Sequence, residues 1–85
     1  SNHQSIIMRF ILLASFHGDS PLNGGVILGT NNLTEAKHKA FEATRHHEDG
    51  GEGWDNCLVL DTETMRIVYN GATNQEINID PIKGK

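Results

Sequence analysis

Apolar residues recur at helical spacing along one long stretch of the chain, Asn32–Asp49. With about 100° between successive residues, Ala36, Ala40 and Phe41 lie on the same side as Leu33. Polar and charged side chains occupy the opposite side: Glu35, His38, Lys39, Glu42, Arg45 and His46. The pattern predicts an amphipathic helix over these residues, with the alanine side buried and the histidines exposed.

The ends of this predicted helix carry capping signals. Asn32 followed three residues later by Glu35 is a variant of the capping box, which satisfies free amide groups at a helix start. Gly50 and Gly51 favour the left-handed conformation that ends many helices. Because an isolated helix of this length is marginal in water, its apolar side must pack on the remaining apolar segments.

Four shorter segments have the apolar pattern of β-strands. They are Ile6–Phe16, Val26–Thr30, Trp54–Asp61 and Met65–Asn70. The first is apolar on both sides, which is typical of a central strand or of a strand whose second side meets another chain. The turn-forming residues 17–25 and 61–64 predict hairpin connections within the first and the last pair of strands.

The element order is therefore ββαββ, an α+β fold in which one helix packs on one face of a mainly antiparallel sheet. The single domain is expected over residues 8–71, with four strands. Residues 72–85 contain Ile77, Ile79 and Ile82 at strand spacing, and they predict either a fifth, edge strand or a loose tail. Residues 1–7 precede the first methionine and are interpreted as an expression remnant or a flexible N-terminus.

Composition narrows the classes of function. The 85 residues carry a net charge of −4, which disfavours nucleic-acid binding because such binding depends on Lys and Arg at the phosphates. A single cysteine, Cys57, excludes an intrachain disulfide and favours a reducing cytoplasm. The apolar run Ile6–Phe16 is too short to span a bilayer, and the expected signal-peptide cleavage site is missing. Its two apolar sides, in so short a chain, favour a homodimer or small oligomer.

His38, Glu42 and His46 are spaced by four residues and would form a line along the polar side of the predicted helix. Imidazoles one turn apart can share Zn²⁺ or a similar metal, with the glutamate as an oxygen ligand. The simpler interpretation is an exposed polar face with an ordinary i,i+4 pair. A metal-bridged or metal-responsive module is therefore an alternative hypothesis, and no other cofactor is indicated.

Acidic residues are concentrated after the predicted helix. No Lys or Arg lies between His46 and Met65, whereas six acidic residues do: Glu48, Asp49, Glu52, Asp55, Asp61 and Glu63. If the end of the helix and the hairpin that carries Asp61 and Glu63 lay on the same edge of the fold, these residues would form a negative surface. Such a surface would attract a basic partner, with Trp54 as an anchor. The main hypothesis is a non-catalytic binder or inhibitor, phage- or mobile-element-like in size, that uses Glu48, Asp49, Glu52, Trp54 and Asp55. A merely solubilising surface is the simpler alternative.

Enzymatic chemistry has little support in the sequence. Cys57 lies within a predicted strand, where a cysteine behaves as a small apolar residue, and no activating base is indicated. The glycine-rich segments lack the spacing of phosphate-binding loops, and their acidic neighbours would repel phosphate. The chain is therefore expected not to be an enzyme, and no small-molecule substrate is identified.

The segment LTEAKHKAFEA, which follows a strand and Thr-Asn-Asn, resembles the helix of HicB-type antitoxin domains in its Thr and Glu-Ala rhythm. The resemblance implies an antitoxin-like regulator as a further alternative. The tryptophan-containing strand and the DTET hairpin have no counterpart in that family, so the chain is not assigned to it.

Overall fold

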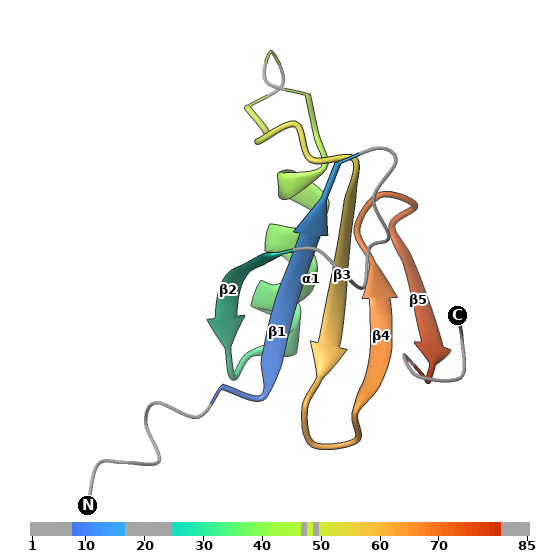
Figure 1. Ribbon diagram of the computed structural model, residues 1–85. Helices are drawn as coiled ribbons and strands as arrows, with labels where there is room; N and C mark the ends of the chain where they lie inside the picture. Colours follow the sequence, from blue (N-terminus) through green and yellow to red (C-terminus); the bar gives the residue numbers. More distant parts are fainter. Residues whose placement is uncertain (1–7, 17–24, 47, 49, 81–85) are drawn as a thin grey trace, which may run out of the picture.

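A computed structural model describes residues 8–16, 25–46, 48 and 50–80. In chain order its elements are β1 (Phe10–Ser15), β2 (Gly25–Thr30), α1 (Leu33–Ala43), β3 (Asn56–Asp61), β4 (Arg66–Asn70) and β5 (Gln75–Ile79). The strands form one antiparallel sheet in the order β2-β1-β3-β4-β5. Figure 1 shows α1 lying along one face of this sheet. The predicted α+β fold is confirmed, with the fifth strand included.

The positions of β1 and β5 answer two questions that the sequence left open. β1 lies between β2 and β3, so it is a central strand of the sheet. One of its apolar sides faces α1, and the other lies on the opposite face of the sheet. β5 forms one edge of the sheet, so the isoleucine-containing tail is a strand as far as Ile79. The predicted turn over residues 17–25 and Ile82 fall largely or wholly outside the described residues.

The start of α1 is fixed by the predicted cap. The Asn32 side chain accepts a hydrogen bond from the Glu35 amide at 3.0 Å. The Glu35 carboxylate, in turn, accepts a hydrogen bond from the Thr30 hydroxyl at the end of β2. The strand end and the helix start are therefore joined by side chains that the sequence places within six residues.

The prediction that the helix continues to Asp49 was wrong, because α1 ends at Ala43. The Thr44 hydroxyl donates to the carbonyls of Phe41 and Gly71, at 2.9 and 3.2 Å. The returning chain then satisfies free carbonyls at the helix end, since the Trp54 amide donates to Ala43 O at 3.0 Å. Hydrogen bonds from distant residues thus replace the two further helical turns that periodicity predicts.

The core lies between α1 and the sheet. On the helix, Ala36, Ala40 and Ala43 are buried, as predicted. The sheet contributes larger side chains to the same cluster: Phe10, Leu12, Ala14, Cys57, Val59 and Tyr69. Because the helix presents only alanines at its centre, its backbone can approach the sheet closely.

The other face of the sheet is mainly aliphatic, with uncharged polar residues towards one end: Ser15, Asn56, Asn70 and Gln75. The strand registers place Ile11, Leu13, Leu58, Leu60, Ile67, Val26 and Ile79 on the face away from α1. Leu58 and Ile67 at its centre are buried, while Val26 is 64% and Ile79 42% exposed. No charged side chain is assigned to this face within the described strands.

Candidate functional site

An open cleft of about 650 Å³ lies at the end of the molecule where α1 stops and the chain leads into β3. The residues that line it are Thr44, His46, Glu48, Gly53, Trp54, Asp55 and Ala72. Three of the predicted partner-binding residues, Glu48, Trp54 and Asp55, therefore share one surface. Glu52 adjoins them through Trp54, whose indole nitrogen lies 3.2 Å from Glu52 Oε1. Asp49 lies outside the described residues.

The backbone holds Trp54 firmly at this cleft. Its amide donates to Ala43 O, and the Gly53 amide donates to Arg45 O at 2.8 Å. Asp55 N donates to Ser15 O at 3.1 Å, which ties the same segment to the end of β1. The segment is therefore anchored to both the helix and the sheet, so Trp54 is presented from a fixed position.

Phe16 completes the aromatic part of the site. Its ring stacks on Trp54 with a centroid separation of 4.4 Å and an interplanar angle of 20°, and Phe16 is 52% exposed. Sequence analysis missed Phe16 as a functional residue because it was assigned only to the first strand. The contact depends on the strand register, which the sequence did not predict: Ser15 pairs with Asn56 between β1 and β3, and this brings together the residues just beyond those strand ends.

The acidic residues do not gather at one edge of the sheet, so the condition for one continuous negative surface is not met. The cleft lies where the chain enters β3, whereas Asp61 and Glu63 lie at the opposite end of this strand (Figure 1). A strand of six residues separates the two groups by about 15–20 Å. The negative surface is therefore limited to the cleft end.

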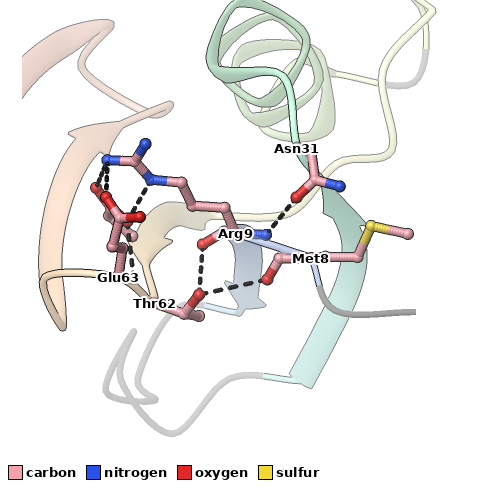
Figure 2. A network of polar contacts seen from close by, with 6 residues as sticks. Met8, Arg9, Asn31, Thr62 and Glu63 are labelled. Carbon is pink, nitrogen blue, oxygen red and sulfur yellow. Dashed lines mark hydrogen bonds and ion pairs between the residues drawn. The ribbon is translucent and has the colours of Figure 1, made fainter. Parts of the chain in front are cut away.

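Asp61 and Glu63 belong to a polar network centred on Arg9, and Figure 2 shows Glu63 beside the Arg9 guanidinium. The guanidinium binds the Asp61 carboxylate through two hydrogen bonds of 3.0 Å and lies 3.1 Å from Glu63 Oε1. The Arg9 amide donates to Asn31 Oδ1 at 2.9 Å, and the Thr62 hydroxyl donates to the Arg9 carbonyl at 2.8 Å. The network joins the start of β1 to the β3–β4 turn and to the loop before α1.

The charge state of Asp61 follows from this network. The hydrogen bonds from Arg9 lower the pKa of its carboxyl group, against the opposing effect of burial. The same pairing raises the pKa of Arg9. Both groups stay charged at neutral pH, which fits a structural ion pair rather than a proton-transfer site.

The three predicted metal ligands do not form one site. His38 pairs with Glu42 across one helical turn, with Nε2 3.1 Å from Oε2. His46 lies beyond the helix end and pairs instead with Glu48, at 3.3 Å. The predicted exposure of both histidines is correct, at 64% and 79% of their side chains. Among the described residues, no group of three or more His, Cys, Asp or Glu side chains is arranged to hold a metal ion.

Cys57 is completely buried in β3, and burial raises the pKa of its thiol to about 12. The thiolate needed for nucleophilic attack is therefore disfavoured at neutral pH. The cysteine acts as a small core residue, as its position within a strand suggested.

The chain matches no protein-family model, and comparisons with curated proteins and with solved structures find no significant similarity. The resemblance of α1 to HicB-type antitoxin helices therefore gains no support. In the part of the chain that the structure describes, no helix is long and apolar enough to cross a membrane. The fold and the cleft define the class of protein only as a small α+β domain with an acidic, aromatic surface at one end.

Proposed function

We propose that this protein is a small, non-catalytic interaction module that binds a basic protein partner, as a binder or inhibitor. The observation that carries the proposal is the cleft at the helix end, which combines Glu48, Trp54 and Asp55 with the adjoining Glu52. A surface of one charge sign accelerates the approach of an oppositely charged partner. A fixed tryptophan adds apolar contact area, and tryptophan is enriched among residues that dominate binding energy.

Charge reversal at the cleft tests this proposal. We expect the double variant Glu48→Lys/Glu52→Lys to bind a mixed Arg/Lys peptide at least about tenfold more weakly than the parent, because two attractive charges become repulsive. Binding can be measured by fluorescence anisotropy of the labelled peptide, at low and at physiological salt.

The matched control is Glu42→Lys/Glu63→Lys, which places the same charge change elsewhere. Each Glu→Lys substitution raises the net charge by two, so both double variants change it from −4 to 0. Glu42 lies on α1, and Glu63 lies on the turn between β3 and β4. We expect this control to retain most of the binding. Equal losses in both variants would mean that net charge alone attracts the peptide, and the cleft would be rejected as the binding surface.

We also propose that the protein is a homodimer that pairs through the aliphatic face of the sheet. The exposed aliphatic residues on this face are Val26 and Ile79. The described strands place no charged side chain on this face, so two copies, each with a net charge of −4, would not bring like charges together there. We expect light scattering to give twice the mass of one chain. Val26→Lys should shift the protein to the monomer, whereas Met65→Lys, at a similarly exposed site on the β3–β4 turn, should not. A parent that is already monomeric would disprove the dimer.

A further inference from the structure

The cleft offers an aromatic surface beside carboxylates, which is more specific than negative charge alone. Trp54 borders the cleft, packs in part against the core cluster and stacks on Phe16. The exposed part of this aromatic pair is therefore mainly the Phe16 ring. Phe16 remains half exposed although it is paired with another ring. Two stacked rings form a flat, electron-rich surface on which a cation can lie.

Glu52 places a carboxylate at the edge of this aromatic surface. The Trp54 indole N–H donates to Glu52 Oε1, which fixes the carboxylate against the ring. A carboxylate has two oxygens, so this bond leaves Oε2 as a second acceptor. Glu48 adds another carboxylate to the cleft lining, where it lies beside His46. The charged groups next to the indole are therefore mainly anionic.

No Lys or Arg is among the described residues that line the cleft. The neighbouring Arg45 lies over the Phe41 ring instead, with its guanidinium carbon 5.2 Å from the ring centroid. The protein thus pairs arginine with an aromatic ring on its own helix, while the aromatic pair at the cleft lacks such a cation from the lining. A cation supplied by a partner would complement both the rings and the carboxylates.

We infer that the cleft binds an arginine side chain of a basic protein segment, with the guanidinium stacked on the Trp54–Phe16 pair and hydrogen-bonded to Glu52. This inference rests on the proposed function and names the partner's chemistry. A planar guanidinium can stack on an aromatic face and at the same time donate in a fork to a carboxylate. A lysine ammonium is a compact, strongly hydrated charge that satisfies the carboxylate but stacks less well.

The test compares short Gly-Ser peptides that carry arginine, lysine or citrulline at the same positions. Trp54 is the single tryptophan of the chain, so its emission reports binding at the cleft directly. We expect the arginine peptide to change this emission and to bind about tenfold more tightly than the lysine peptide. The neutral citrulline peptide, which keeps the planar shape, should not bind measurably.

Variants of the aromatic pair separate stacking from charge. In calorimetric titrations, Phe16→Ser and Trp54→Leu should lose the preference for arginine while keeping the weaker affinity for the lysine peptide. Phe16 is half exposed, so Phe16→Ser keeps the test valid if Trp54→Leu fails to fold. Glu52→Gln should weaken the binding of both the arginine and the lysine peptide.

The possible outcomes distinguish this inference from the proposed function. Equal affinity for the arginine and lysine peptides would overturn the arginine preference but leave an acidic surface that binds basic partners. Binding of neither peptide would overturn both. An arginine preference that survives in Phe16→Ser and Trp54→Leu would place the recognition elsewhere and would overturn the inference for this cleft.

Discussion

Gly71→Ala is expected to destabilise the protein by about 3 kcal/mol or more, at the upper end of the effects of overpacking. A Cβ atom added at Gly71 would lie 2.3 Å from the Ala40 carbonyl oxygen and 3.0 Å from the Ala40 Cβ. The obstacle is backbone, which cannot rotate away as a side chain can. α1 would have to move off the sheet, and the buried alanine contacts would be weakened.

Urea denaturation of the variants measures this effect. Gly25→Ala is the matched control, because an added Cβ there meets nothing within 4 Å and the site is exposed. The control should change the free energy of unfolding by only a few tenths of a kcal/mol, or slightly stabilise the protein. Ala40→Gly should fail to rescue Gly71→Ala, because it removes the Cβ contact and leaves the closer carbonyl contact. Wild-type stability in Gly71→Ala would mean that α1 does not rest on Gly71.

The close approach of Gly71 to Ala40 shows which features of the fold the sequence patterns predict and which they do not. Periodicity predicted the alanine face of the helix and the strands beneath it, because burial repeats at the spacing of each element. It gave Gly71 no role beyond its place directly after the predicted strand Met65–Asn70. The role of Gly71 depends on its contact with Ala40, 31 residues earlier in the chain. Local sequence patterns do not predict contacts between residues so far apart.

The helix end shows the same limit. The residues after Ala43 continue an acceptable helical pattern, and Gly50 was the nearest obvious stop. The actual end depends on hydrogen bonds from Trp54 and Thr44 to carbonyls that become partners only in the folded chain. This error carried over to the metal hypothesis, because a line of three ligands required His46 to remain on the helix.

The sequence predicted which acidic residues could form a binding surface, but it did not predict how they are arranged in the fold. Sequence showed that acidic residues follow the helix, and the structure brings Glu48, Trp54 and Asp55 to one cleft. The predicted strand Trp54–Asp61 already implied that Asp61 lies a strand length away from Asp55, and β3 in the structure has this separation. Acidic residues that are close in the sequence therefore form one negative surface only if no extended strand separates them.

Asp61→Asn is expected to lower the free energy of unfolding at neutral pH by about 1.5–3 kcal/mol, the range for hydrogen bonds to a charged group. The carboxylate accepts two hydrogen bonds from Arg9 and one, at 2.9 Å, from the Glu63 amide. An asparagine side chain keeps one acceptor oxygen, but its amide group would face the guanidinium donors. The hydrogen bonds that join the end of β3 to the start of β1 would therefore be weakened.

The effect should depend on pH, because Arg9 lowers the pKa of Asp61 in the folded protein. A carboxyl group with a lowered folded pKa stabilises the protein fully above its unfolded pKa, near 4, and loses that contribution as pH falls through the folded pKa. Arg9, whose pKa is raised, stays protonated throughout this range. The difference between wild type and Asp61→Asn should thus be constant from pH 7 to about 5 and shrink below about pH 4.

Urea denaturation across this pH range provides the measurement, and Glu76→Gln provides the control. Lys37 lowers the pKa of Glu76, mainly through a hydrogen bond, but that glutamate side chain is 74% exposed. Exposed ion pairs contribute little, so the control should show a smaller loss at neutral pH. If the Asp61→Asn difference stayed the same down to pH 3, the negative charge of Asp61 would not be its source. The cost would then come from side-chain packing, and the Arg9 network would be a consequence of the fold rather than a support for it.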